Sequence, residues 1–304
     1  MKPENIFTKL NDVLQNQGAE YRIINIDHLN KAEADLQRLY SNGFFDDGFF
    51  QERLASFRFS APDDVFKARS ILIVAVPQPI VHIIFSWRGS ENIITLPPTY
   101  VQQTDKEIKE ILEEILSPEG FHISLARIPQ KAVATHSGLM QYGRNNLGYV
   151  QGMGSFHRPV AFFTDLPCLE DHWVAPVMME RCTRCRACIK ACPTGAIGED
   201  RFLLHAERCI TFHNEHLKEI PDYVSSSMHH CLFGCMICQQ VCPENRQFIN
   251  RVEVREHFSE EETLNIMKGV PYVALACHTQ KKLDRLSLTE DYSLLARNLG
   301  LLLH

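Results

Sequence analysis

The stretch CTRCRACIKACP, residues 182–193, decides how this chain folds, and CMICQQVCP, residues 235–243, repeats part of it. The chain has 304 residues and 11 cysteines, and ten of the cysteines lie between Cys168 and Cys242. A chain of this length buries a hydrophobic core without covalent staples, so it does not need a disulfide framework. The clustered cysteines therefore indicate metal ligation or redox chemistry.

The spacing of the two stretches is typical of bacterial ferredoxins with two 4Fe-4S clusters. The first reads C-x2-C-x2-C-x3-C-P and the second C-x2-C-x3-C-P. In such runs the cysteine before proline ligates the other cluster. The spacing predicts that the first cluster is held by Cys182, Cys185, Cys188 and Cys242. Three ligands of the second cluster are then Cys192, Cys235 and Cys238.

The second cluster needs a fourth ligand, for which Cys209 is predicted and Cys231 is the competing candidate. Cys231 lies only four residues before Cys235, a spacing that suits zinc but not the usual ferredoxin loop. A pair of structural zinc sites is the alternative for the whole region, because zinc also binds four cysteines. Cys168 and Cys277 fit no motif and are expected to be small core residues.

The composition places the chain among ordinary globular proteins. It is 45% hydrophobic and 22% charged, with a net charge of −6, which excludes disordered and fibrous classes and does not imply a large basic surface for nucleic acid. The N-terminus has no basic region followed by an apolar stretch, and the most apolar run, residues 71–85, is too short to span a bilayer. We expect a soluble, cytoplasmic protein with no membrane partner.

Helical and strand-like segments alternate before the cysteines. Apolar spacing predicts helices over residues 6–14, 29–40, 104–116 and 131–137, and strands over residues 21–26, 70–76, 121–128 and 159–163. Residues 81–85 and 93–96 predict a hairpin around Arg88-Gly89-Ser90. Capping boxes are predicted at Thr104 with Glu107 and at Ser259 with Glu262.

We therefore expect a mixed α+β or α/β fold in three consecutive parts. Residues 1–175 form an α/β cofactor and substrate domain, residues 176–250 a ferredoxin-like domain with two 4Fe-4S clusters, and residues 251–304 a helical C-terminal segment. The last segment ends in a leucine stripe at Leu294, Leu295, Leu299 and Leu302.

Residues 125–167 read LARIPQKAVATHSGLMQYGRNNLGYVQGMGSFHRPVAFFTDLP. Followed by the paired cysteine runs, this segment resembles the epoxyqueuosine reductases and, more distantly, the corrinoid reductive dehalogenases. The isolated Arg208-Cys209-Ile210 is similar to that family's lone cysteine, which favours Cys209 over Cys231. Residues 294–299, LLARNL, are similar to its last helix.

The resemblance implies a base-off cobalamin between the α/β domain and the clusters. Candidate cofactor contacts are Lys131, Gly138, Gly143, Arg144, Asn145, Asn146, Gly154 and Ser155. The glycines have an alternative explanation as turn residues, since glycine readily adopts positive φ. His136 and His157 are expected to make ordinary polar contacts, because the chain has no D-x-H-x-x-G cobalamin motif.

Asp105 is the candidate proton donor, because Tyr100 precedes it by five residues as in the family's motif, and Tyr142 is a further candidate. The alternative for Asp105 is a purely structural role in the first turn of a helix, where negative charge is favourable. The alternative for Tyr142 is core packing.

The resemblance implies an oxidoreductase that deoxygenates its substrate with electrons relayed through two 4Fe-4S clusters. The substrate is a tRNA nucleoside or a small molecule, and the electrons come from an external low-potential donor such as a ferredoxin or flavodoxin. The alternatives are a reductive dehalogenase-like enzyme and a non-enzymatic ferredoxin-type carrier that reduces a corrinoid protein.

Overall fold

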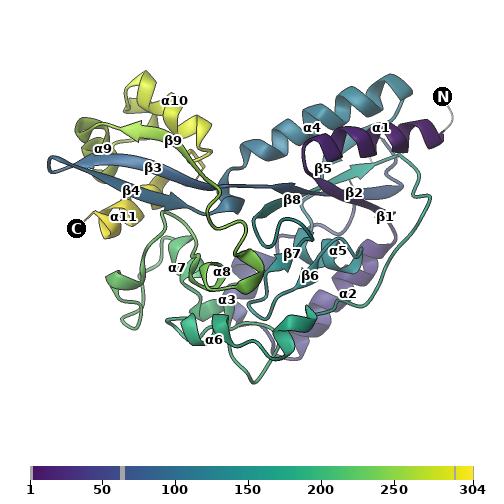
Figure 1. Ribbon diagram of the computed structural model, residues 1–304, viewed down its shortest axis with the longest axis horizontal. Helices are drawn as coiled ribbons and strands as arrows, with labels where there is room; N and C mark the ends of the chain where they lie inside the picture. Colours follow the sequence, from purple (N-terminus) through teal and green to yellow (C-terminus); the bar gives the residue numbers. More distant parts are fainter. Residues whose placement is uncertain (1–2, 62–65, 291, 304) are drawn as a thin grey trace. The chain divides into compact units, whose positions relative to one another are not determined.

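The computed structural model describes residues 3–61, 66–290 and 292–303 (Figure 1). The chain divides into two compact units: Met1–Pro77 with Thr104–Cys185, and Gln78–Gln103 with Arg186–His304. This partition differs from the three consecutive parts expected, because residues 78–103 fold with the C-terminal part of the chain. The helices and strands mix as expected for the α+β class. No helix in the described ranges is long and apolar enough to cross a membrane.

The first unit is built on a four-stranded antiparallel sheet in the order β1-β2-β8-β5. Its strands are β1 (Glu20–Asn25), β2 (Ser70–Pro77), β5 (Ile123–Leu125) and β8 (His157–Thr164). The hairpin of β6 (Gln141–Tyr142) and β7 (Gly148–Tyr149) forms a separate small sheet. Strand β5 is shorter than the predicted 121–128, whereas β1, β2 and β8 confirm the prediction within about two residues.

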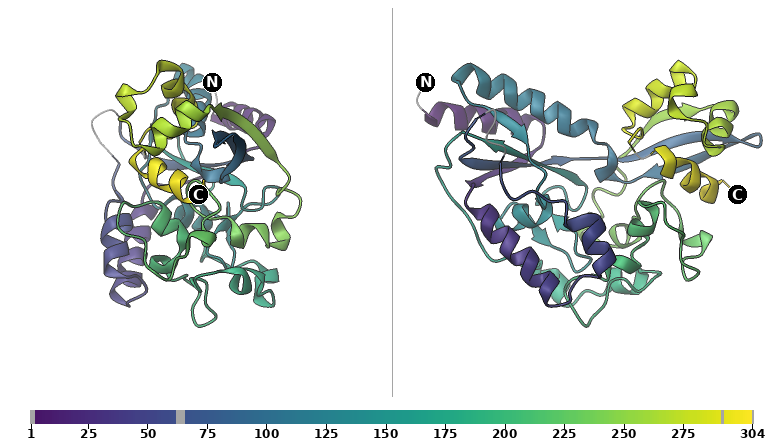
Figure 2. Two further views of the ribbon diagram at one scale, coloured as in Figure 1. Left: turned by 90° about the vertical axis from the view of Figure 1, so that its left-hand side faces the viewer. Right: turned by 180° about the vertical axis from the view of Figure 1, so that it is seen from behind.

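Helices cover both faces of the four-stranded sheet (Figures 1 and 2). They are α1 (Pro3–Asn16) and α4 (Gln103–Leu116) on one face, and α2 (His28–Ser41) and α5 (Gln130–His136) on the other. Leu72 and Val74 of β2 pack against the first pair, and Ile71 and Ile73 against the second. Since both faces of β2 are buried, its sequence is a continuous apolar run rather than an alternation. The short helix α3 (Asp47–Phe49) follows α2.

Helix α4 begins two residues earlier than the predicted capping box requires. Thr104 is the second helical residue, so it is not the N-cap, and the prediction of a box with Glu107 is wrong. The N–H of Gln103 donates to the Ser287 hydroxyl at 3.1 Å. A distant segment thus satisfies one of the terminal N–H groups of this helix.

The second unit contains a three-stranded sheet in the order β4-β3-β9. Its strands are β3 (Ile80–Trp87), β4 (Ser90–Leu96) and β9 (Val252–Phe258). The predicted hairpin is confirmed: Arg88 and Gly89 both have positive φ, 52° and 74°, as a tight two-residue turn requires. Strand β9 corrects the prediction of helix from residue 251 onward, since it pairs with β3 in parallel. That pairing is also why residues 78–103 belong to this unit.

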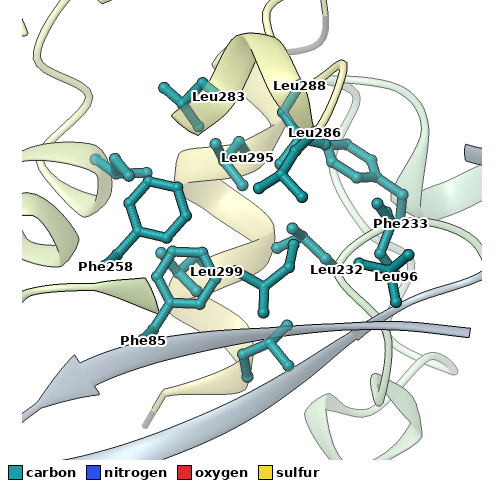
Figure 3. Packing of buried hydrophobic residues seen from close by; sticks show 14 of the residues in the cluster. Phe85, Leu96, Leu232, Phe233, Phe258, Leu283, Leu286, Leu288, Leu295 and Leu299 are labelled. Carbon is teal, nitrogen blue, oxygen red and sulfur yellow. The ribbon is translucent and has the colours of Figure 1, made fainter. Parts of the chain in front are cut away.

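A leucine-rich core joins the three-stranded sheet of the second unit to its last helices (Figure 3). These are α9 (Glu260–Met267), α10 (Cys277–Arg285) and α11 (Tyr292–Leu302). Phe85 and Phe258 stack with ring centroids 4.8 Å apart, and Leu295 and Leu299 of α11 belong to the same buried cluster. Ser259 caps α9 in the predicted box with Glu262. The cysteine region adds α6 (Ala187–Ala191), α7 (Ile210–Asn214) and α8 (Ile237–Gln240).

Candidate functional site

The second predicted cluster takes its ligands from three short helical segments of the second unit. Cys192 directly follows α6, Cys209 directly precedes α7, and Cys238 lies in α8, which packs against α6. Burial, with smaller contributions from Cys209 and Cys192, raises the pKa of Cys235 to about 12. The influence of Cys209 and Cys192 on the pKa of Cys235 indicates that these thiols lie near one another. Metal coordination deprotonates cysteine thiols, so such half-buried neighbouring thiols suit an iron–sulfur cluster.

The two candidates for the fourth ligand have different surroundings. Burial raises the pKa of Cys209, and the neighbouring Cys192 and Glu215 raise it further. Cys231 is 1% exposed and forms a backbone bridge with Thr95 of β4, and its pKa is raised by burial and by Cys235. Cys209 therefore lies near two of the other predicted ligands, which favours it, and its selection stays a prediction.

The first cysteine run crosses the division between the units. Cys182 and Cys185 belong to the first unit, whereas Cys188 and Cys242 belong to the second. Backbone hydrogen bonds from the Cys182 N–H to the Met179 carbonyl, at 2.9 Å, and from the Cys185 N–H to the Arg181 carbonyl, at 3.2 Å, shape the start of the run. The assignment of these four cysteines to one cluster stays a prediction.

The loop after β6 is directly bonded to the start of the first cysteine run within the first unit. The Tyr142 N–H donates to the Val177 carbonyl and the Met179 N–H donates to the Tyr142 carbonyl, both at 2.9 Å. In addition, Nε of Arg144 donates to the Cys182 carbonyl at 3.3 Å. The proton-donor candidate Tyr142, the predicted cofactor contact Arg144 and the first cysteine loop thus form one hydrogen-bonded structure.

Three predicted residues meet around the turn between β6 and β7. Lys131 Nζ donates to the backbone carbonyl of Asn146 at 2.7 Å and to its Oδ1 at 3.2 Å, and it lies 5.8 Å from the ring centroid of Tyr142. Asn146 is 7% exposed, and its side-chain N–H2 is buried without a hydrogen-bond partner. A buried amide donor of this kind lacks an acceptor, which an amide or phosphate oxygen of a cofactor would supply.

The neighbouring Asn145 and Gly143 serve the packing of the same turn. Asn145 is 4% exposed, donates to the Tyr149 hydroxyl at 3.0 Å and accepts from the Leu147 N–H at 3.3 Å. A Cβ on Gly143 would lie 2.4 Å from the Tyr149 ring and 2.5 Å from Asn145 Oδ1. Only glycine fits at this position, so packing accounts for Gly143 without a cofactor.

The remaining predicted contacts lie nearby in the sequence and have local roles. Gly138 follows α5 with φ of 75°, a left-handed conformation that ends the helix. Gly154 closes a backbone bridge with Val150, and Ser155 beside it is buried. Their function as cofactor contacts stays a prediction.

Asp105 is held by a residue that the sequence did not single out. Nε and one terminal nitrogen of Arg158 donate to the two carboxylate oxygens of Asp105, the second at 2.7 Å. The side chains are 17% and 20% exposed, for Arg158 and Asp105. Such a bidentate pair neutralises the carboxylate and occupies both of its oxygens. The only sequence signal for Arg158 is a lone charge at the start of an apolar strand.

Tyr100 belongs to the second unit, whereas Asp105 belongs to the first. The Tyr100 hydroxyl donates to the carboxylate of Glu215. Burial and then Glu215 raise the pKa of Tyr100 well above its usual value, and Cys209 and Cys231 add to the effect. Tyr100 thus lies beside the second cysteine set.

Residues outside the predicted sites are placed as follows. Cys277 is exposed at the start of α10, so the expectation that it is a core residue is wrong, and Cys168 is half-buried. His136 contacts the Val174 carbonyl at 2.8 Å, and His157 the Gly148 carbonyl at 3.0 Å. Both histidines make ordinary polar contacts, as expected.

Comparison with known proteins supports the iron–sulfur interpretation. Residues 181–245 match the protein family described as "4Fe-4S double cluster binding domain". The match covers both cysteine runs together with Cys209, and confirms iron–sulfur clusters as cofactors of this segment.

Sequence relatives confirm the resemblance to epoxyqueuosine reductases. The epoxyqueuosine reductase of Cyclobacterium marinum is 36% identical over 141 residues, which are 46% of this chain and 44% of the relative. That of Pseudomonas aeruginosa is 33% identical over 189 residues, 55% of this chain and 51% of the relative. The matched segment of the chain spans about half the length of these curated relatives.

Solved structures share the fold over nearly the whole chain. An epoxyqueuosine reductase crystallised with an epoxyqueuosine-modified tRNA stem loop has a TM-score of 0.70 at 21% identity, covering 99% of this chain and 82% of that one. The enzyme from Streptococcus thermophilus has a TM-score of 0.64 at 20% identity, covering 98% and 81%. At these identities the likeness shows the fold alone.

Proposed function

We propose that this chain is an iron–sulfur, cobalamin-dependent reductase of the epoxyqueuosine reductase type. The double-cluster match at residues 181–245 and the named relatives support an oxidoreductase, and the fold shared with the tRNA-bound enzyme supports a tRNA nucleoside as its substrate. Electrons would come from an external low-potential donor of the ferredoxin or flavodoxin kind. Iron–sulfur clusters suit a reducing, cytoplasmic location.

The observation that carries the proposal is the hydrogen-bonded link between the β6 loop and the first cysteine run. Tyr142 pairs with the backbone just before Cys182, and Arg144 holds the Cys182 carbonyl itself. A carrier that only passes electrons has no need to fix this polar loop at its cluster. An enzyme that reduces a bound cofactor does need to fix such a loop, because the reacting groups must stay oriented.

The residues present fit a corrinoid in the first unit. When bound, the corrinoid would supply the reducing metal centre, and the clusters would supply single electrons. The unpartnered amide of Asn146 would donate to an oxygen of the cofactor, and Lys131 would hold the turn that presents this amide. Gly143, Asn145 and Tyr149 keep the turn compact, since the Gly143 position admits no side chain.

Tyr142 is the proton donor that this geometry favours over Asp105. Burial raises the pKa of Tyr142, and a hydrogen bond with the Thr135 side chain offsets part of this rise, so the Tyr142 hydroxyl keeps its proton at neutral pH. The Asp105 carboxylate is instead engaged at both oxygens by Arg158. Tyr100 is the third candidate, and its hydroxyl is engaged by Glu215.

The test is anaerobic reconstitution of the full chain with iron, sulfide and cobalamin, followed by absorption spectra and turnover assays. We expect about eight irons and one retained cobalamin per chain, and reduction of an epoxyqueuosine-containing anticodon stem loop. Intact clusters without retained cobalamin would replace the proposal with the electron-carrier function. Turnover of a halogenated aromatic but not of the stem loop would replace it with the dehalogenase-like function.

The Tyr142→Phe variant tests the proton donor. We expect turnover to fall about a hundredfold or more, the usual loss when general acid catalysis is removed. Iron content and cobalamin retention should not change, because the backbone bonds of residue 142 remain. Tyr21→Phe, on β1, is the matched control. Unchanged turnover in the Tyr142 variant would exclude this role.

A further inference from the structure

Helix α11 carries two polar residues inside its leucine stripe. Arg297 and Asn298 lie between Leu295 and Leu299, which are both fully buried, and Asn298 is itself only 1% exposed. A buried amide in an apolar core is costly unless all its hydrogen-bonding groups have partners. The hydrogen-bond partners of these two side chains therefore show which segments of the chain helix α11 contacts.

Arg297 binds the end of the segment that begins at Cys209. Helix α7 starts directly after Cys209, and the Arg297 guanidinium donates to the carbonyls of His213 at 2.9 Å and His216 at 2.5 Å. A further contact reaches the Lys218 carbonyl at 3.4 Å. The same guanidinium donates to Asn298 Oδ1 through Nε, at 3.0 Å, and a terminal nitrogen, at 2.9 Å. The two residues thus act as one bonded pair.

Asn298 joins the Cys209 segment to the segment before Cys235. Its side-chain nitrogen donates to the Asn214 carbonyl at 2.9 Å and to the Leu232 carbonyl at 2.8 Å. Asn214, which is 1% exposed, closes the connection by donating to the Gly234 carbonyl at 2.9 Å. Two stretches that are some twenty residues apart in the chain are therefore held at a fixed separation.

We infer that Arg297 and Asn298 are positioning residues for the second 4Fe-4S cluster, because they set the separation between Cys209 and Cys235. A cuboidal cluster needs its four thiolates at fixed positions. Cys235 and Cys238 are spaced by their own loop, whereas Cys209 lies between two short helical segments with no other predicted ligand close to it in the sequence. The C-terminal helix supplies that missing constraint. The inference rests on the two-cluster part of the proposed function and not on the corrinoid or the substrate.

The experiment compares Asn298→Ala, Arg297→Gln and Arg297→Lys in the full, anaerobically reconstituted chain. We expect Asn298→Ala and Arg297→Gln to lower iron from about eight to about four per chain, with loss of one cluster's signal in the electron paramagnetic resonance spectrum. Arg297→Lys keeps the positive charge but lacks the planar guanidinium with its several donors. Its loss of iron should therefore be intermediate. The matched control is Arg285→Lys, whose guanidinium binds Glu256, since both residues lie outside the two cysteine runs and outside the Cys209 segment.

A double variant distinguishes a positioning role of Asn298 from a general effect of its substitution on protein stability. If Asn298 acts through the Cys209 ligand, Cys209→Ser with Asn298→Ala should lose no more iron than Cys209→Ser alone. Full iron content in Asn298→Ala and Arg297→Gln would overturn the inference, and so would an equal loss of both clusters. A wild-type chain that binds only one cluster would overturn the proposed function as well, so the two failures are distinguishable.

Discussion

The two carboxylate oxygens of Asp105 are both bound by the single guanidinium of Arg158. Their side chains are largely shielded from water, so the pair is worth more than an exposed ion pair. Removing one partner leaves the other partly buried and without its counter-charge. At the scale of this residue pair, Asp105 has a complete structural role at the start of α4.

We therefore expect Asp105→Asn to lower the free energy of unfolding by about 1–3 kcal/mol, measured by denaturant unfolding. Arg158→Gln should cost a similar amount, and the double variant little more, because each single change already breaks the pair. Glu110→Gln, whose partner Lys106 is 70% exposed, is the control and should change stability by less than about 1 kcal/mol. A variant with unchanged stability but a hundredfold lower turnover would instead place Asp105 in the chemistry.

His157 gives a second prediction at this scale. Burial lowers the pKa of His157 to about 4, below its ordinary value of 6.5. Between these values the unfolded chain binds a proton that the folded chain excludes, so stability falls as the pH drops from about 6.5 to about 4. The loss is at most about 3 kcal/mol. The His157→Asn variant should show a flatter stability profile over this range, and an unchanged profile would contradict the assigned burial effect.

The helices show how far local sequence determines local structure. Both S/T-x-x-E segments have the same capping pattern, yet only Ser259 with Glu262 forms the box. At the Thr104 segment, the hydroxyl of Ser287, from a distant part of the chain, accepts a hydrogen bond from the Gln103 N–H, and the helix begins at Gln103. Local patterns predicted most helices and strands, but such long-range contacts do not register in a local pattern.

Strand β9 and the polar site residues also depend on long-range contacts that a local sequence pattern does not predict. The seven residues of β9 become a strand because β3 offers a pairing edge some 170 residues earlier in the chain. The motif spacing predicted a segment with two 4Fe-4S clusters, which the family match at residues 181–245 confirms, since the motif of such a segment is local. It could not predict Arg158 beside Asp105 or Glu215 beside Tyr100, because each pair is formed only by folding.

The capping box of α9 supports a prediction at the scale of the element. The Ser259 hydroxyl accepts from the Glu262 N–H at 3.3 Å, and the Glu262 carboxylate accepts from the Ser259 N–H at 2.8 Å. Ser259→Ala should lower the free energy of unfolding by about 1 kcal/mol, and Ser259→Asp should restore most of it. Thermal unfolding measures both. Equal stability of the alanine and aspartate variants would mean that the box contributes nothing.

At the scale of the whole chain, the predicted cluster ligands come from distant stretches of the sequence. In the predicted assignment, the first run supplies Cys192 to the second cluster and the second run supplies Cys242 to the first, so neither run would complete a cluster alone. The second cluster would also depend on the lone Cys209 and, by our inference, on α11 near the C-terminus. Iron content therefore reports on the folding of widely separated segments.

Cys209→Ser and Cys231→Ser separate the two candidates for the last ligand. Cys209 lies near both Cys192 and Cys235, whereas the backbone of Cys231 is bridged to β4 and its thiol is buried. We expect Cys209→Ser to lower iron from about eight to about four per chain, and Cys231→Ser to keep about eight. Cys277→Ser, at an exposed thiol, controls for general effects of removing a cysteine. The reverse result for the first two variants would make Cys231 the ligand and Cys209 a thiol that does not bind the cluster.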